Sequence, residues 1–186
     1  MRGKLVVISG PSAGVGKDTI LKMFLQKHPD WVQPTSTTTR EPREGEVDGK
    51  DMTFVDRETF KQWQKEDTFI ESIQVDNGQW YGTQREPVER ALINGKNVIL
   101  RIDVRGAMVL KEKMPEAMLV FITAESEEAL EQRIRNRGAE NEEGIQRRLE
   151  LAKSELPYAA KYDHVITNPT GHPEQALTDL QKAINL

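Results

Sequence analysis

Cysteine is absent from the 186 residues of the chain, which excludes disulfide bonds and thiolate metal sites. Long apolar runs are also absent: none approaches the roughly 18 residues of a membrane-spanning helix, so we expect no membrane partner. The apolar stretch LVVIS near the N-terminus is too short for a signal peptide and runs into a glycine-rich loop. These features predict a soluble, cytoplasmic protein.

An excess of positive charge is missing too. The chain has 26 Lys and Arg against 30 Asp and Glu, a formal net charge of −4. Because nucleic-acid binding usually needs a basic face, we expect no nucleic-acid partner. The basic residues nevertheless gather in two places that need an explanation, namely Arg40 with Arg43, and Arg133 with Arg135, Arg137, Arg147 and Arg148.

Hydrophobic spacing predicts alternating strands and helices. Short β-branched runs at 4–9, 97–104, 117–123 and 164–167 predict buried strands, and helical spacing predicts helices at 17–28, 57–66, 84–94, 126–137, 141–156 and 173–185. The polar stretch 34–60 predicts short strands and loops before the second helix. The alternation favours a three-layer α/β fold with a parallel sheet.

We therefore expect a single domain over 1–186, and its length suffices for a substantial core. The core comprises 1–33, 84–125 and 157–186. Two insertions interrupt this core: a β-rich one at about 34–83 and a helical pair at about 126–156.

The segment SGPSAGVGKDT at 9–19 joins the first expected strand to the first expected helix. A glycine-rich turn in this context directs backbone N–H groups and the positive end of the helix at an anion. Five residues separate Gly10 from Gly16 where the usual phosphate loop has four, and Asp18 follows Lys17. A lysine at a helix start opposes the helix dipole unless phosphate is present. We therefore prefer a phosphate loop that bulges at Ala13 to a plain glycine turn, and its residues are Gly10, Pro11, Ser12, Ala13, Gly14, Val15, Gly16, Lys17, Asp18 and Thr19.

More specific blocks follow in one order. They are STTTREPREGEVDGKD (36–51), FIE (69–71), WYGT (80–83), ILRIDVRG (99–106) and RIRNRGAENEEGIQRRL (133–149). In order, spacing and wording they resemble the guanylate kinase family over nearly the whole chain. The resemblance implies an enzyme of purine nucleotide metabolism that transfers a phosphoryl group from ATP to GMP with Mg²⁺. It also implies a phosphate-loop core, a GMP-binding insertion at 34–83 and a mobile lid at 126–156.

The resemblance assigns roles to individual residues. Ser36 and Glu71 contact guanine with Asp103 nearby, and Thr83 forms a hydrogen bond near the base. The GMP phosphate is held by Arg40, Arg43 and Tyr81. The catalytic residues are Lys17, Arg133, Arg137 and Arg148. Asn168 lies beside adenine, and Thr19 holds Mg²⁺, with a water-mediated contact from Asp18 as the alternative. Acceptance of dGMP, and a monomer or a homodimer, stay open.

The chemistry of these residue types agrees with the assignment. Guanine offers N1–H and N2–H₂ donors that a carboxylate such as Glu71 accepts, and a site left with an unpaired buried carboxylate rejects adenine. Two arginines clamp one phosphate. Phosphoryl transfer needs positioning and charge neutralisation rather than a nucleophilic side chain, and closing arginines contribute about 10³–10⁵ in rate.

The chain departs from the family pattern in four places. The loop is one residue longer, Asp18 replaces a small residue, Met52 replaces a tyrosine, and Arg101 replaces the first aspartate of a D-I-D motif. Met52 has no hydroxyl, so we expect weaker GMP binding. For Arg101, pairing with an acidic neighbour and contact with phosphate both stay open.

Other interpretations compete with these assignments. The chain as a whole could be a related kinase for a sugar phosphate, or a non-catalytic module that binds phosphorylated proteins. The lid arginines could pair with Glu140, Glu142 and Glu143, and we expect Arg135 and Arg147 to be solvated surface. Asn168 could only cap a turn before Pro169.

Overall fold

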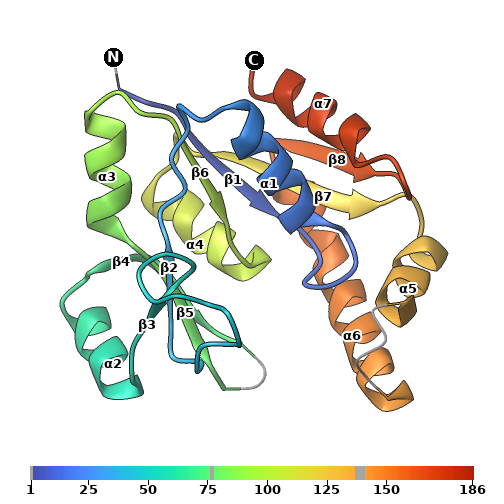
Figure 1. Cartoon of the computed structure of the whole chain (residues 1–186), viewed down its shortest axis with the longest axis horizontal. Coiled ribbons are helices and arrows are strands. Elements are labelled where there is room, and N and C mark those ends of the chain that lie inside the picture. The colour runs from blue at the N-terminus through green and yellow to red at the C-terminus, as the bar shows by residue number, and fades with distance from the viewer. Residues whose placement is uncertain (1, 76–77, 137–140) are drawn as a thin grey trace. The chain divides into compact units, whose positions relative to one another are not determined.

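A computed structural model describes residues 2–75, 78–136 and 141–186 (Figure 1). The chain divides into two compact units. Unit 1 comprises the segment up to Leu5 together with Asp30–Leu100 and Arg105–Ala117, and unit 2 comprises Val6–Pro29, Arg101–Val104 and Met118–Leu186. The residues expected to bind GMP lie in unit 1, apart from Asp103, and the phosphate loop and lid lie in unit 2.

The elements confirm the α/β class. In chain order they are β1 (Leu5–Ser9), α1 (Lys17–Lys27), β2 (Ser36–Thr38), β3 (Thr53–Phe54), α2 (Arg57–Lys65), β4 (Phe69–Gln74), β5 (Trp80–Gln84), α3 (Arg85–Ile93), β6 (Val98–Arg101), α4 (Val104–Lys113), β7 (Met118–Ala124), α5 (Glu127–Asn136), α6 (Glu142–Glu155), the 3₁₀ helix η1 (Leu156–Lys161), β8 (His164–Asn168) and α7 (Pro173–Ala183).

One sheet is parallel, as its apolar strands predicted. Its strand order is β6-β1-β7-β8. Within unit 2, β1 runs parallel to β7 with Val6 opposite Met118, and β7 runs parallel to β8 with Val120 opposite His164. The strands β1 and β7 are buried along nearly their whole length, as expected for parallel strands covered on both faces. The phosphate loop follows the carboxyl end of β1, which is where open α/β sheets bind ligands.

The second sheet has the order β3-β2-β5-β4 and lies within unit 1. β5 pairs antiparallel with β2 and with β4. Phe60 of α2 is fully buried and stacks on Phe69 of β4, with their ring centroids 4.5 Å apart. This aromatic contact anchors α2 to the sheet that carries the predicted guanine contacts.

One expected strand was wrong at its carboxyl end. The interval 97–104 was predicted as a strand, but β6 ends at Arg101 and helix α4 begins at Val104. Val104, Ala107 and Leu110 are all fully buried at helical spacing, and this stripe determines α4. The helix itself was not predicted.

Among the described residues, none of the helices combines the length and apolar composition that membrane crossing requires.

Candidate active site

Three adjacent strands of unit 1 bring the predicted guanine contacts together. On β5, Thr83 lies opposite Ser36 of β2 on one side and opposite Glu71 of β4 on the other. Thr83 Oγ1 donates a hydrogen bond of 2.7 Å to Glu71 Oε1. The Glu71 and Thr83 side chains are almost fully buried, with exposed fractions of 3% and 1%. Strand register therefore gathers one carboxylate and two hydroxyls.

Helix α4 completes the surroundings of this carboxylate. A Cβ atom added to Gly106 would lie 2.5 Å from Glu71 Oε2, so a side chain at position 106 would displace the carboxylate. The block ILRIDVRG contains Gly106, but this glycine received no role from sequence alone. Its contact with Glu71 could not be predicted because helix α4, which carries Gly106, was not predicted.

The predicted phosphate arginine Arg40 is held by several neighbours. Its Nη1 and Nη2 donate to Glu46 at 2.7 and 2.8 Å, Nη2 also donates to Met52 Sδ at 3.3 Å, and the guanidinium lies 5.4 Å from the Phe54 ring centroid. Hydrogen bonding to Glu46, and more weakly to Tyr81, raises the pKa of Arg40. Met52 thus contacts the guanidinium although it has no hydroxyl.

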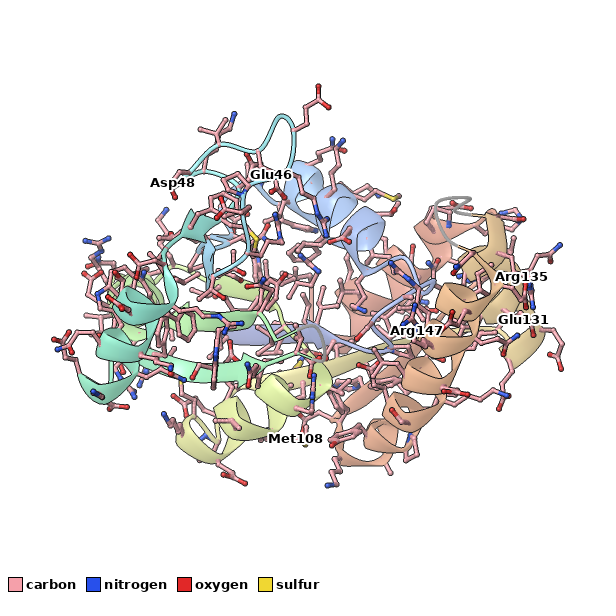
Figure 2. All side chains as sticks on the ribbon, turned by 90° about the horizontal axis from the view of Figure 1, so that it is seen from below. Glu46, Asp48, Met108, Glu131, Arg135 and Arg147 are labelled. Atoms are coloured by element: carbon pink, nitrogen blue, oxygen red, sulfur yellow. The ribbon has the colours of Figure 1, made fainter. Side chains whose placement is uncertain are left out.

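Glu46 also holds the chain at the second predicted phosphate arginine. The backbone N–H of Arg43 donates to Glu46 Oε2 at 2.7 Å, while the Arg43 side chain is exposed. Figure 2 labels Glu46 on the loop between β2 and β3. Hydrogen bonds from Arg40 and Arg43 lower the pKa of Glu46 to about 2. Glu46 belongs to the T-T-R-x-P-R-x-G-E block, so the motif contained a positioning carboxylate that received no role.

In unit 2, the phosphate loop needs glycine at its start and at its end. Gly10 has φ 139°, and a Cβ there would lie 2.1 Å from Ile122 O of β7. Gly16 has φ 79°, and a Cβ there would lie 2.5 Å from Asn168 Nδ2. Between them Ala13 is buried and accepts a 3.1 Å hydrogen bond from Val15 N. A tight turn accommodates the additional residue, and its contact with phosphate stays a prediction.

Lys17 lies along the loop. Its Nζ donates to Gly10 O at 3.1 Å and to Pro11 O at 2.5 Å. Burial, followed by the positive charge of Arg101, lowers the pKa of Lys17 to about 8. A cation held by neutral carbonyl groups, with a second cation nearby, suits a site that receives an anion.

A carboxylate that sequence reasoning missed holds the loop from the other side. Glu155, the last residue of α6, has an exposed fraction of 3% and accepts hydrogen bonds from Ser12 N at 2.6 Å and Ser12 Oγ at 2.5 Å. Burial raises the pKa of Glu155 against these two hydrogen bonds. The contact joins residues 143 positions apart, so no local pattern indicated it.

Two of the four departures from the family pattern meet each other. Arg101 Nε lies 2.8 Å from Asp18 Oδ1. The structure therefore favours pairing of Arg101 with an acidic neighbour, and it commits the Asp18 carboxylate to a cation. Thr19 is exposed in the first turn of α1, and its role as a metal ligand stays a prediction. Within the described residues, no group of three or more His, Cys, Asp or Glu side chains forms a metal cage.

Asn168 holds the loop as well. Its Nδ2 donates to Val15 O at 2.9 Å, and the side chain is buried. Its Oδ1 is buried and has no hydrogen-bond partner among the residues that the structure describes. Because such acceptors are rarely left unpaired in proteins, this oxygen suits a donor such as the adenine amino group, although the adenine contact stays a prediction.

The lid arginines differ in their surroundings. Arg133 Nη2 donates to Glu125 at 2.6 Å and to Asn168 O at 2.7 Å, and Nη1 reaches Gly14 O at 3.5 Å. Arg133 therefore lies against the phosphate loop. Arg148 is exposed on α6, and Arg137 lies outside the described residues.

The arginines that we expected on the solvated surface are less alike. Arg135 Nε pairs with Glu131 at 2.8 Å and its Nη1 with Glu142 at 2.6 Å, and Arg147 is exposed (Figure 2). The Arg135 side chain is 37% exposed. Arg135, which we expected to be solvated surface, is thus paired with Glu142, one of the acidic residues considered as partners of the other lid arginines.

Comparison with known proteins identifies the family of the chain. The family model for guanylate kinase matches residues 2–186. The chain belongs to the guanylate kinase family. Similar relatives include the guanylate kinases of Clostridium perfringens strain SM101, 47% identical over 90% of this chain and 76% of the relative, and of Synechocystis, 42% identical over 99% and 94%.

Solved structures agree. The crystal structure of guanylate kinase from Anaplasma phagocytophilum is 31% identical, covers 99% of this chain and 86% of its own, and superposes with a TM-score of 0.78. Shikimate kinase from Bacteroides thetaiotaomicron, 13% identical with a TM-score of 0.53, shares the fold alone.

In this guanylate kinase family member, Asp103 belongs to unit 2, where its negative charge raises the pKa of Lys17 against the lowering effect of burial and Arg101. Its predicted place near the guanine stays a prediction.

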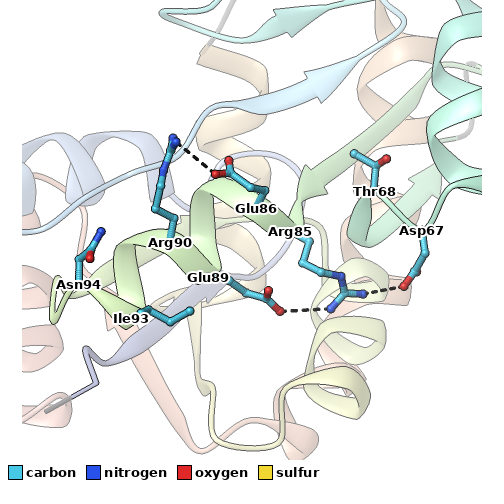
Figure 3. A pocket seen from close by; sticks show the side chains of 8 residues that line it. All are labelled: Asp67, Thr68, Arg85, Glu86, Glu89, Arg90, Ile93 and Asn94. Atoms are coloured by element: carbon cyan, nitrogen blue, oxygen red, sulfur yellow. Dashed lines mark hydrogen bonds and ion pairs between the residues drawn. The ribbon is translucent and has the colours of Figure 1, made fainter.

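A cavity of about 520 Å³ lies in unit 1 and is lined by residues of α3, by Asn94 and by Asp67 and Thr68, which precede β4 (Figure 3). Its charged lining is largely self-paired: Arg85 with Asp67 and Glu89, and Arg90 with Glu86. Paired surface charges of this kind contribute little, and we assign the cavity no role.

Proposed function

We propose that the chain transfers the γ-phosphoryl group of ATP to GMP, which yields ADP and GDP. The observation that carries the proposal is the buried Glu71 carboxylate beside Thr83 and Ser36, in a chain of the guanylate kinase family. A buried carboxylate is stabilised by hydrogen-bond donors, and guanine N1–H and N2–H₂ are donors of the kind that it accepts.

The donor nucleotide would bind to the loop of unit 2. Lys17 at the start of α1 is close to two loop carbonyls and exchanges these for ATP phosphate oxygens. Asn168 Oδ1 accepts from the adenine amino group. Arg133 lies at Gly14 of the loop, and together with Arg148 and Arg137 it neutralises charge that develops during transfer.

The residues at the loop fit Mg²⁺ that arrives with ATP. This ion usually takes one or two protein oxygen ligands, with phosphate oxygens and water completing its shell. The exposed Thr19 hydroxyl would supply such a ligand, whereas the Asp18 carboxylate is paired with Arg101. When bound, Mg²⁺ lowers the negative charge of the phosphate chain.

The reaction needs no nucleophilic side chain. An oxygen of the GMP phosphate, held by Arg40, Arg43 and Tyr81, attacks the γ-phosphorus, and the bond to the β-phosphate oxygen of ADP breaks. The proposal includes the cytoplasmic location expected from the sequence and a role in purine nucleotide metabolism, because the reaction converts GMP into GDP.

A coupled assay of ADP release tests the proposal. The acceptors are GMP, dGMP, AMP, CMP, UMP and a sugar phosphate, each with ATP and Mg²⁺. We expect turnover with GMP and a fall of at least about 10²-fold in Lys17→Ala, with turnover by dGMP measured in the same series. GMP binding without turnover would instead indicate a non-catalytic module, and turnover with the sugar phosphate alone a different kinase.

A further inference from the structure

Arg101 lies where a strand of the parallel sheet ends and faces the first turn of α1. It is the last residue of β6, and its Nε lies 2.8 Å from Oδ1 of Asp18. Asp18 directly follows Lys17, the residue that lies along the phosphate loop. The ion pair therefore places a second cationic side chain at the residue that follows the loop lysine, within unit 2.

Charged groups of both signs surround Lys17. Arg101 disfavours the charged form of Lys17, while the carboxylates of Glu155, Asp18 and Asp103 favour it. Burial also disfavours the charged form and is the largest cause of its lowered pKa. Two neighbouring cations repel each other, and the phosphates of a nucleotide on this loop would add negative charge to that of the carboxylates.

The guanidinium of Arg101 is held differently from those of the other arginines near predicted phosphate positions. Arg40 and Arg133 use their terminal nitrogens on the carboxylates of Glu46 and Glu125, and their side chains are only 14% and 17% exposed. Arg101 meets its carboxylate through Nε, and its side chain is 41% exposed. Contact through Nε orients the planar group and leaves the Nη1 and Nη2 fork for a pair of phosphate oxygens.

We propose that Arg101 is a further phosphate-binding residue of the donor nucleotide site and that Asp18 is its positioning residue. The inference rests on the proposed function, because it takes the loop at 10–19 to bind ATP. Asp18 and Arg101, two of the departures from the family pattern, then act together. The Asp18 carboxylate orients the Arg101 guanidinium, and the guanidinium adds positive charge at the phosphates.

Binding of ATP with Mg²⁺, measured by titration calorimetry without acceptor, tests the inference in Arg101→Gln, Asp18→Asn and the double variant. We expect Arg101→Gln to raise the Kd for ATP about tenfold, as for loss of a charge-assisted hydrogen bond, and Asp18→Asn to raise it about threefold. The double variant should match Arg101→Gln alone, since Asp18 acts through Arg101. Arg147→Gln, a change at an exposed arginine of α6, is the control and should leave the Kd unchanged.

Dependence of binding on the phosphates provides a readout that a structural ion pair would not move. The Kd for adenosine, which has no phosphates, should be unchanged in Arg101→Gln and in Asp18→Asn, whereas the Kd for ATP should rise in both. Equal losses of thermal stability in both single variants, with an unchanged Kd for ATP, would overturn the inference and leave a structural pair.

Measurements on the same set of variants distinguish this inference from the proposed function. Weaker ATP binding in Arg101→Gln supports the inference even where the wild-type protein fails to phosphorylate GMP. Normal phosphorylation of GMP by the wild-type protein, with unchanged ATP binding in Arg101→Gln, overturns the inference and leaves the proposed function standing.

Discussion

The two units organise their charged groups over different distances along the chain. In unit 1, the contact between Glu71 and Thr83 joins residues 12 positions apart, and that between Arg40 and Glu46 joins residues 6 apart. In unit 2, Ser12 and Glu155 lie 143 positions apart, and Arg133 reaches the loop across 119. The predicted acceptor site is thus local in that it lies largely within the β-rich insertion at 34–83, whereas the predicted donor site joins distant segments of its unit.

This difference has a physical cause. Neighbouring antiparallel strands fix which side chains lie opposite each other, so three polar groups meet through register alone. A phosphate loop presents backbone groups, and its shape depends on whatever packs around it. Here those neighbours are Glu155, Asn168 and Ile122 near the carboxyl end of β7.

The largest expected effect comes from the local site. In Glu71→Gln, Thr83 keeps an acceptor, but an amide NH₂ replaces the oxygen that would face the guanine donors. We expect kcat/KM for GMP to fall about 10³-fold with ATP held saturating. Glu89→Gln, a change at a more exposed glutamate of α3, is the control. A fall of less than tenfold would show that Glu71 does not read the base.

Gly106→Ala tests the position of the Glu71 carboxylate without removing it. The new Cβ would displace Glu71 Oε2, so KM for GMP should rise about tenfold. Alanine should at the same time favour helix α4 by up to about 1 kcal/mol. An unchanged KM would mean that the position of the carboxylate is not critical.

A smaller effect is expected from Glu155→Ala on the loop. The change leaves Ser12 N–H without its acceptor, so the free energy of unfolding in urea should fall by about 2 kcal/mol and KM for ATP should rise several-fold. Glu150→Ala, at an exposed position on the same helix, provides the baseline. Equal free energies of unfolding and equal KM values for ATP in the two variants would show that Glu155 does not hold the loop.

The pH dependence tests the charge on the loop. Lys17 is protonated below its pKa of about 8, so kcat/KM for ATP should decline as pH rises through 8 and approach a tenfold loss per pH unit. Lys17→Arg stays protonated throughout and should abolish this decline, whatever its activity. A decline that persists in Lys17→Arg would assign it to another group.

The smallest expected effect concerns Met52. Its sulfur accepts a hydrogen bond from Arg40 at 3.3 Å. A hydroxyl in Met52→Tyr would add a donor for the GMP phosphate, so KM for GMP should fall by a factor of about 3. An unchanged or raised KM would count against a role for this position in phosphate binding.

The same contrast explains how much could be predicted from sequence. Periodic apolar residues predicted most strands and helices, and the motifs marked Glu71, Thr83 and Lys17. Helix α4 was missed because Ile102 and Val104 continue the alternation of apolar residues after β6, so strand and helix patterns overlap there.

The carboxylates that position other groups were missed for a different reason. Glu46 lay inside a recognised block but received no role, because a motif does not say which member binds another. Glu155 lies 143 positions from Ser12, which it holds, and Glu125 lies 8 positions before Arg133, a spacing that no helical pattern marks. Only the fold shows such contacts.

Initial rates measured with both nucleotides varied test most directly the central claim that two separate sets of residues serve the two substrates. Glu71→Gln should raise KM for GMP and leave KM for ATP within about twofold. Glu155→Ala should raise KM for ATP and leave KM for GMP within the same limit. If both constants rise together in both variants, the claim of two separate sets is contradicted.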